Sequence, residues 1–236
     1  PADGFSTTGP ILAVFPRGFD THNLVFHNED VFRSLTKESP TLILEANSLE
    51  PVLHFAEADV LAESDERRAL IIRPLVRLKN STRYIVAIHS LLDKSLTPLQ
   101  PPEGFLQLRD GLARGNEVLE PLARRYETEI FARLESFGIP RHTLQLAWDF
   151  TTSSEENQTR DMLRVRQLLI EHFKQNKPQV KITKITDNYG EKIYRRVEGI
   201  FQVPLFLDST EPGAKLFRDE LGRVTGNSVV DVPFSM

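Results

Sequence analysis

The segment HTLQLAWDFTTSS, residues 142–154, holds the side chains whose types and spacing are most suggestive of chemistry in this chain. Its tryptophan, Trp148, is the only one in the sequence and stands next to Asp149. An acid beside a tryptophan at a strand end can orient a histidine or hold a ligand. It can equally accept hydrogen bonds from the amides of a following helix, whose dipole favours negative charge at that end. The sequence favours the structural role for Asp149.

A serine hydrolase of the elbow type needs its nucleophile on a sharp turn between a strand and a helix, with small residues two positions before and after it. Glycine pairs have this spacing in GLARG, residues 111–115, and in GRVTG, residues 222–226. They place Ala113 and Val224 at the nucleophile position, and neither side chain can attack a carbonyl. The sequence therefore assigns no catalytic residue and leaves open whether the chain is part of an enzyme.

Metal and cofactor motifs are also missing from the sequence. None of the six histidines forms a helical pair four residues apart or belongs to a two-histidine zinc motif. The acidic stretch AEADVLAESDE, residues 56–66, lacks the spacing and the glycine of a calcium-binding loop. No phosphate-binding glycine loop occurs, and the absence of cysteine excludes thiolate catalysis and disulfides. We therefore assign no metal ligand and no cofactor-binding residue, and expect no cofactor.

The composition limits the classes of partner. The 236 residues carry a formal net charge of −4, which argues against nucleic-acid binding because that function needs a basic face. The basic cluster KIYRR, residues 192–196, is flanked by acids and is typical of a solvated strand edge. No stretch approaches the roughly 20 apolar residues of a membrane span. The partners that remain are proteins.

Alternating apolar residues and turn residues predict short strands in the N-terminal part of the chain. Prolines bound the apolar run at residues 10–16, which predicts a buried or edge strand. The runs at residues 40–46 and 51–57 are separated by NSLE, which predicts a hairpin. Alternation at residues 68–78 and 79–92 predicts two more strands.

The apolar pattern then changes to a helical period. Apolar residues recur three and four positions apart from residue 120 to residue 137, Pro121 suits a first helical turn, and Gly138 suits a C-terminal cap. A helix is therefore predicted at residues 120–137. A second helix is predicted after Ser153, which stands three residues before Glu156 in a capping-box pattern. Its apolar stripe consists of Met162, Val165, Leu169 and Phe173.

The segment between these helices is predicted to be a strand. Leu144, Leu146 and Trp148 alternate on one face, and Phe150 follows in register. Trp148 and Phe150 are therefore expected in the core. After Pro178 the period of two returns. Three further strands are predicted at residues 179–188, 194–207 and 227–234.

These period changes predict an α+β fold with more than one module. Residues 1–155 are expected to form an immunoglobulin-like antiparallel β-sandwich that carries an inserted helix near residues 120–137. A linking helix is expected at residues 156–176. Residues 177–236 are expected to form a second, smaller β-rich module.

The run RALIIRPLVRLKNSTRYIVAIHSLLD resembles a strand pair of bacterial immunoglobulin-like domains. The matching positions are Pro74, Leu78, Thr82, Tyr84 and Val86. The segments DGFSTTGPILAVF, RYIVAI, LAWDFTTSS and VEGIFQVPLFL, in this order, together resemble the N-terminal region of bacterial secreted or lipoprotein lipases and esterases. In that family this region lies upstream of an α/β-hydrolase core, and the last strands here resemble those that precede the core.

The resemblance implies a protein that is secreted or belongs to the cell envelope. It carries over no catalytic residue, because in the family the oxyanion-hole turn, the nucleophilic serine and the triad acid and histidine follow strands like those at the end of this sequence. The start PADGF reads as internal, which favours a trimmed or processed chain. We expect the partners to be other protein chains or a further C-terminal part of the same polypeptide.

Three functions stay open from the sequence. The first is a non-catalytic accessory or interaction module of a lipase-like protein. The second is a fragment of a carboxylic-ester hydrolase whose catalytic part is absent from this chain. The third is a structural subunit of a larger assembly, for which we expect exposed apolar strand edges that partner chains bury.

Overall fold

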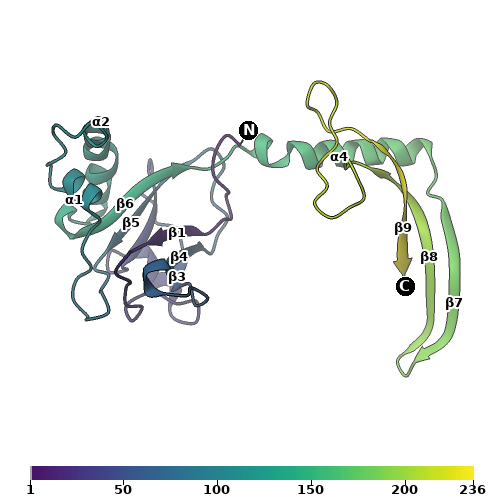
Figure 1. Ribbon diagram of the computed structural model, residues 1–236, viewed down its shortest axis with the longest axis horizontal. Coiled ribbons are helices and arrows are strands. Elements are labelled where there is room, and N and C mark those ends of the chain that lie inside the picture. Colours follow the sequence, from purple (N-terminus) through teal and green to yellow (C-terminus); the bar gives the residue numbers. More distant parts are fainter. Residues whose placement is uncertain (1) are drawn as a thin grey trace. The chain divides into compact units, whose positions relative to one another are not determined.

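The computed structural model describes residues 2–236, and the chain divides after Glu155 into two compact units. We call them the N-terminal unit and the C-terminal unit, the latter running from Glu156 to Met236. Both contain antiparallel sheet and α-helix (Figure 1). The predicted α+β class is therefore confirmed.

Two three-stranded antiparallel sheets form the framework of the N-terminal unit. In the first sheet β4 lies between β1 and β3, and in the second β5 lies between β2 and β6. β1, β2 and β3 alternate between the two sheets, whereas the consecutive strands β3 and β4 are paired, as are β5 and β6. Their bounds are β1 (Ile11–Val14), β2 (Thr41–Glu45), β3 (His54–Ala58), β4 (Ala69–Pro74), β5 (Arg83–His89) and β6 (Leu144–Thr151).

One hydrophobic cluster contains side chains from both sheets. Buried Ala13, Ala56 and Ile72 come from the first sheet and buried Val86 from the second, and Trp148 of β6 packs against this cluster. Removing this apolar surface from water is the main term that holds the two sheets together.

Helices cover the other face of the second sheet. A second cluster joins Leu44 and Ile85 of that sheet to Phe105, Ile130 and Leu134 of the helical region. As a result β5 is buried on both faces, and every residue in it after Arg83 is buried. The helices are α1 (Glu103–Arg109), α2 (Glu120–Arg125), a π-helical segment (Tyr126–Phe131) and α3 (Ala132–Phe137), and three short 3₁₀ turns occupy Val31–Leu35, Asp65–Arg67 and Arg141–Thr143.

The helix predicted at residues 120–137 is confirmed, because α2, the π-helical segment and α3 follow one another without a break. Gly138 ends it in the left-handed conformation at φ 101°. The N–H of Gly138 donates to Glu135 and the N–H of Ile139 donates to Leu134, both at 2.9 Å. These bonds satisfy carbonyls that the end of the helix would otherwise leave free.

A hairpin was predicted at residues 40–57. Its turn is present, but the prediction that its two strands pair with each other is wrong. Around the turn Glu45 N–H donates to Glu50 at 2.9 Å and Val52 N–H donates to Ile43 at 2.8 Å. The next donor in the ladder, His54 N–H, instead donates to the hydroxyl of Ser34 at 3.1 Å. The chain therefore leaves β2, and β3 pairs with β4 in the other sheet.

The prediction that Leu144 shares a face with Trp148 and Phe150 is also wrong. A β-bulge shifts the pairing of β5 with β6 between Ile88 and His89, so that Ile88 faces Leu146 while His89 faces Leu144. A shift of one residue turns a side chain to the opposite face of a sheet. Leu144 is therefore buried in the helix-covered cluster, whereas Trp148 and Phe150 pack against the cluster that the two sheets share.

The C-terminal unit consists of one long helix and a three-stranded antiparallel sheet. In this sheet β8 lies between β7 and β9. All four elements agree with the apolar periods from which they were predicted. They are α4 (Glu155–Gln175), β7 (Val180–Gly190), β8 (Ile193–Leu205) and β9 (Ser228–Ser235). Across residues 2–236, no helix combines the length and the apolar character that crossing a bilayer requires.

Candidate interaction surfaces

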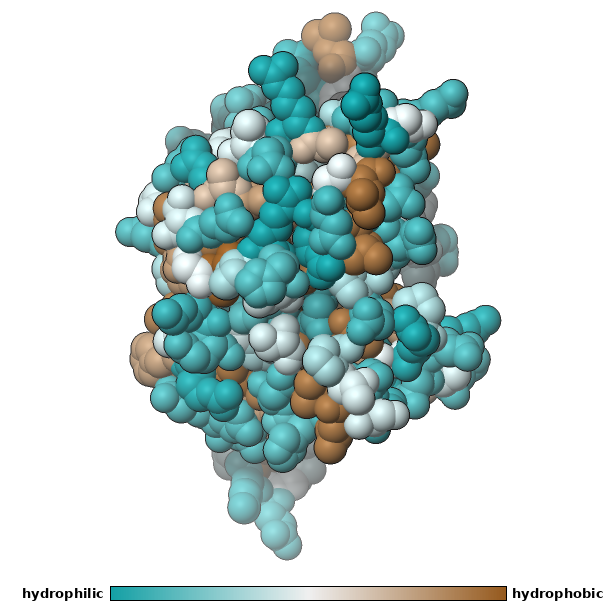
Figure 2. Space-filling view, turned by 90° about the vertical axis from the view of Figure 1, so that its left-hand side faces the viewer, coloured by the Kyte–Doolittle hydropathy of each residue, from teal (hydrophilic) through white to brown (hydrophobic). Residues whose placement is uncertain are grey.

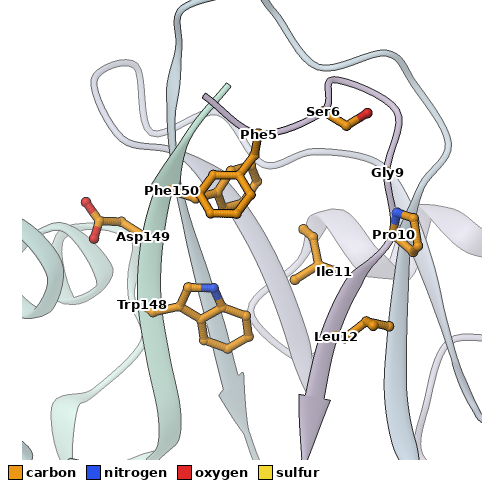
Figure 3. Close-up of a pocket in the computed structure, with 9 residues that line it drawn as sticks. All are labelled: Phe5, Ser6, Gly9, Pro10, Ile11, Leu12, Trp148, Asp149 and Phe150. Carbon is orange, nitrogen blue, oxygen red and sulfur yellow. The ribbon is translucent and has the colours of Figure 1, made fainter. Parts of the chain in front are cut away.

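A groove opens in the N-terminal unit between β1 and β6, which are edge strands of their sheets (Figure 3). It contains a cavity of about 350 Å³. Trp148 and Phe150 approach the cavity from β6, Ile11 and Leu12 approach from β1, and Phe5 lies at one end. We call it the β1–β6 groove. The residues that line it are Phe5, Ser6, Gly9, Pro10, Ile11, Leu12, Trp148, Asp149 and Phe150.

Trp148 and Phe150 were expected in the core, and both are only half-buried. One side of each contacts the shared cluster, and Phe150 stacks on buried Tyr84 at a ring-centroid distance of 5.8 Å. The ring of Phe5 meets Phe150 edge-on, also at 5.8 Å. The other side of each β6 side chain faces the groove, which explains the remaining exposure. Trp148 and Phe150 thus contribute to the core with one side and form an accessible aromatic surface with the other.

Asp149 contributes no charge to the interior of the groove. Its carboxylate lies on the other side of β6 from Trp148 and Phe150 (Figure 3). There it is only 6% exposed and forms ion pairs with Arg83, at 3.1 Å from its Nε, and with Arg125. The predicted interaction of Asp149 with the amides of a following helix is therefore replaced by charge pairing with β5 and α2. The groove interior stays apolar.

Hydrogen bonds join the segment around Phe5 to the residues at the end of β6. Phe5 N–H donates to Thr151 at 2.9 Å, and Ser153 N–H donates to Phe5 at 2.8 Å, so that the two segments run parallel. The carboxylate of Asp3 accepts from the hydroxyls of Ser153 at 2.7 Å and Ser154 at 2.6 Å. These hydroxyl bonds, the one from Ser154 first, lower the pKa of Asp3. The predicted capping of α4 by Ser153 stays a prediction.

A buried histidine that the sequence analysis did not single out lies at the start of β3. The ring of His54 has Nδ1 at 2.7 Å from the carbonyl of Val52 and Nε2 at 3.0 Å from the hydroxyl of Thr41. Nδ1 therefore donates to Val52. Nε2 also lies 3.2 Å from the carbonyl of Thr41, and in the neutral ring it accepts from the Thr41 hydroxyl. Burial lowers the pKa of His54, which favours the neutral ring. This hydroxyl–histidine pair resembles an activated nucleophile, but both residues are 0% exposed and no substrate can reach them.

The two positions that match the nucleophile spacing are buried as well. Ala113 is 2% exposed and lies in the connection between α1 and α2. Val224 is 1% exposed and lies in the connection between β8 and β9. Neither stands between a strand and a helix, as a nucleophile elbow must.

The acidic stretch at residues 56–66 is part of β3 and of the loop that follows it. Its Asp65 pairs with Arg68 at 2.9 Å and with Lys94 at 3.3 Å. Throughout residues 2–236, no three or more histidine or acidic side chains gather closely enough to hold a metal ion. The stretch is thus a charge-paired surface loop.

The C-terminal unit presents an apolar sheet face, which follows from the strand register. Directly opposed residues share a face, and Ile182 opposes Gly199, Ile185 opposes Val197, and Phe234 opposes Gly199 from the other side. Every side chain of this face is exposed or half-buried. The ion pair of Asp187 with Arg195, at 2.6 Å, lies on the same face near its end. We define the apolar sheet face by its apolar residues, Val180, Ile182, Ile185, Ile193, Val197, Phe201, Val203, Leu205, Val230, Val232 and Phe234.

The opposite face of the same sheet is mixed and polar. Lys181 and Lys184 of β7 oppose Ile200 and Glu198 of β8, and Asp231 of β9 lies on the same side. The basic cluster at residues 192–196 lies at the start of β8, where four of its five residues are exposed, as predicted. The predicted strand edge is wrong, because β8 is the central strand of its sheet. The sheet is therefore amphipathic.

Gly199 lies at the centre of the apolar sheet face. A Cβ atom at this position would lie 2.7 Å from the ring of Phe234 and 2.6 Å from the carbonyl oxygen of Lys181. The ring of Phe234 fills the space above the glycine and lies 6.1 Å from the ring of Phe201. The face is thus an ordered aromatic and aliphatic surface.

The helix α4 leaves much apolar surface uncovered. None of its residues is buried, and Met162 and Ile170 are 68% and 45% exposed. In the predicted stripe Val165, Leu169 and Phe173 are half-buried, whereas Met162 is exposed. An ion pair of Arg218 with Asp161, at 2.5 Å, ties the β8–β9 connection to the helix. The apolar sheet face therefore gains no buried residue from α4.

The exposed apolar residues of the C-terminal unit contrast with the face drawn in Figure 2, on the side of α1 and α2. That face is mostly hydrophilic, and its apolar side chains form small separate groups. Scattered apolar groups are normal on a protein surface, whereas a contiguous apolar face marks a place of contact.

A scan against protein-family models found no match to this chain, and neither did searches of curated proteins and of solved structures. The function must therefore be argued from the surfaces themselves.

Proposed function

We propose that this protein is a non-catalytic interaction module that binds another polypeptide through the apolar sheet face of its C-terminal unit. The observation that carries the proposal is the extent of this face, which holds eleven apolar side chains, none of them buried. Ten of them are contiguous in the register, and the ion pair of Asp187 with Arg195 separates Ile193 from the rest. A sheet with one apolar face is stable when a second layer covers that face. Neither α4 nor the β8–β9 connection buries any of these side chains, and those of β7 are exposed.

The resemblance to the N-terminal region of secreted lipases and esterases supports a particular partner, an α/β-hydrolase core. Such a core is a separate layer of sheet and helices, and it can cover the apolar sheet face whether it belongs to the same polypeptide or to another. The same resemblance would make the protein an accessory part of a secreted or cell-envelope assembly. Catalysis by this chain itself is disfavoured, because Ala113 and Val224 are buried and cannot act as nucleophiles.

We further propose that the N-terminal unit is an immunoglobulin-like sandwich in which residues 2–155 form no counterpart of the first strand beside β1. In this fold strands A, B, E and D form one sheet and strands C, F and G form the other. The sheet orders β1-β4-β3 and β2-β5-β6 correspond to B-E-D and C-F-G in chain order. The helices α1 to α3 would then be an insertion between strands F and G.

Tyr84 gives independent support to this assignment. Immunoglobulin-like domains have a tyrosine near the start of strand F whose hydroxyl bonds to the backbone a few residues upstream. Tyr84 is the second residue of β5, and its hydroxyl accepts from the N–H of Lys79 at 2.9 Å. The chain departs from antibody domains because it has no cysteine pair and carries its tryptophan on β6.

Site-specific photo-crosslinking tests the proposed binding face. A benzophenone side chain is placed at Ile182, on the apolar sheet face, or at its neighbour Lys181, on the opposite face. In the producing cells we expect position 182 to crosslink to one polypeptide and position 181 to give no such product. Equal crosslinking from both positions, or none from either, would contradict the proposal.

Reconstitution with the crosslinked polypeptide, purified, then measures the contribution of the face. Ile185 is 57% exposed, so covering the rest of its side chain contributes about 1 kcal/mol, and a lysine there adds the cost of burying a charge. We expect Ile185→Lys to weaken binding at least about tenfold. Thr186→Lys, on the same strand and the opposite face, is the matched control and should leave the affinity unchanged. Equal affinities for the two variants would refute the proposal.

The absence of catalysis has a separate test. Ester hydrolysis needs an activated nucleophile and preorganised donors for the oxyanion. Purified protein is assayed with short and long acyl esters and with a fluorophosphonate that labels activated serines. We expect no turnover and no labelling. Stoichiometric labelling of one serine, with turnover lost when that serine is replaced, would make the chain a hydrolase.

A further inference from the structure

We propose that the β1–β6 groove accepts an extended peptide strand of a partner protein, with apolar side chains at alternate positions. This inference rests on the immunoglobulin-like assignment proposed above, in which none of residues 2–155 takes the position of strand A. Strand A would lie beside β1, the strand that corresponds to B, and the groove opens along β1. Strand addition to an exposed sheet edge is a common mode of peptide recognition.

Both walls of the groove are strand edges. β1 pairs only with β4 and β6 pairs only with β5, so each has one side without a partner strand over most of its length. Free main-chain groups along such an edge are a template for another strand. An apolar groove between two sheet edges therefore favours an extended chain over a helix, because only an extended chain can use these main-chain groups.

The edge of β6 already pairs with an extended segment at one end. In an antiparallel pair, residues alternate in whether their N–H and C=O point toward the neighbouring strand or away from it. Thr151 C=O points away from β5, since it accepts from Phe5 N–H at 2.9 Å. Ala147 C=O also points away, since it accepts from the hydroxyl of Tyr126 at 3.2 Å. Asp149 lies midway between Ala147 and Thr151, so its N–H and C=O also point away from β5. They are the next groups along the edge of β6, after those that pair with Phe5, to which an added strand could bond.

The lining of the groove matches one face of such a strand. Side chains of a strand alternate between its two faces, so every second residue of a bound strand would enter the cavity. There it would meet Trp148, Phe150 and Ile11, while Leu12, on the outer face of β1, lines the rim of the groove. The carboxylate of Asp149 is turned toward its arginine partners, so no charge opposes apolar side chains. The cavity of about 350 Å³ lies within the usual range for pockets that bind ligands.

Trp148 makes this binding directly observable, because it is the only tryptophan and lines the groove. The probe is the synthetic peptide KTVTVTVTVK, which alternates valine with threonine. Its control is KTTTTVVVVK, which has the same composition without the alternation. We expect the alternating peptide to shift the emission of Trp148 to shorter wavelength in a saturable manner, with an affinity at least tenfold above that of the control.

Two variants of β1 locate the binding. Leu12 lines the groove and is 57% exposed, and Val14 is 48% exposed on the same face of the strand but does not line the groove. We expect Leu12→Lys to weaken binding of the alternating peptide at least tenfold and Val14→Lys to change it less than twofold. Amide hydrogen exchange should show that the N–H of Asp149 becomes protected when the peptide binds.

Three outcomes would overturn the inference. They are the absence of any spectral change with the alternating peptide at millimolar concentration, equal affinity for both peptides, and a response to hexanol without a response to either peptide. The last outcome would make the groove a pocket for small apolar molecules. These failures are distinct from failure of the proposed function, because the peptide experiments probe the N-terminal unit and crosslinking from position 182 probes the C-terminal unit.

Discussion

Replacing Tyr84 with phenylalanine removes one hydroxyl from the N-terminal unit and leaves the ring in place. Tyr84 is 2% exposed, and its hydroxyl accepts from Lys79 N–H at 2.9 Å. Losing such a bond costs about 0.5–1.5 kcal/mol, or up to about 3 kcal/mol when the remaining partner stays buried without water. Because this bond is only part-buried, water can replace the lost hydroxyl. We therefore expect Tyr84→Phe to lower the free energy of unfolding by about 1 kcal/mol.

Urea unfolding followed by the fluorescence of Trp148 measures this change, since the only tryptophan lies in the N-terminal unit. The midpoint should fall while the slope stays the same, as expected for a loss of stability alone. Tyr194→Phe is the control, because Tyr194 is 75% exposed and belongs to the C-terminal unit. An unchanged Tyr84→Phe midpoint would refute the contribution of this hydrogen bond, and a loss above about 3 kcal/mol would mean that the ring itself repacks.

Three further predictions follow from buried or crowded groups. Burial lowers the pKa of His54 and of His89, so below about pH 6.5 the unfolded chain binds more protons than the folded chain. The urea midpoint should therefore fall as the pH falls from about 6.5 toward the folded-state pKa. His54→Gln should weaken this pH dependence and leave the part that is due to His89. Gly199→Ala should destabilise the C-terminal sheet by about 1–3 kcal/mol in thermal circular dichroism, because its Cβ would collide with the ring of Phe234, and an unchanged melting temperature would contradict the crowding. Asp149→Asn should cost about 1–3 kcal/mol by Trp148 fluorescence, less than for a fully buried pair because both arginine partners are partly exposed, and no loss would mean that these ion pairs contribute nothing.

Local patterns predicted most elements of the fold, although not the helix α1. The apolar period between residues 120 and 137 and the glycine at 138 located a helix that the structure confirms. Alternation located the strands of both units in the same way. These features depend on residues a few positions apart, so the sequence carries them directly.

Pairings between distant residues could not be predicted. The bulge beside His89 turns Leu144 to the helix-covered face, and nothing within β6 signals it. Asp149 pairs with Arg83 and Arg125 because β5 and α2 are brought next to β6. The network around His54 depends equally on a hydroxyl thirteen residues away, that of Thr41.

The candidate surfaces were only partly visible in the sequence. Alternating apolar residues in the three C-terminal strands predicted sheet, but only the register puts Ile182, Val197 and Phe234 on one face. A signal was present, because a strand with one apolar side needs a covering layer and the sequence supplies only one helix in this unit. The β1–β6 groove joins residues near both ends of the N-terminal unit, so the sequence order gave no sign of it.

Thiol labelling tests the central claim most directly, since the chain has no cysteine and each substitution introduces a single reactive group. Ile182→Cys places a thiol on the apolar sheet face and Lys181→Cys places one on the opposite face, both at exposed positions. In the isolated protein we predict rapid reaction of both variants with a maleimide. In the native assembly within producing cells, the Ile182→Cys variant should react at least tenfold more slowly while the Lys181→Cys variant keeps its rate. Equal rates for both variants in both settings would contradict the account.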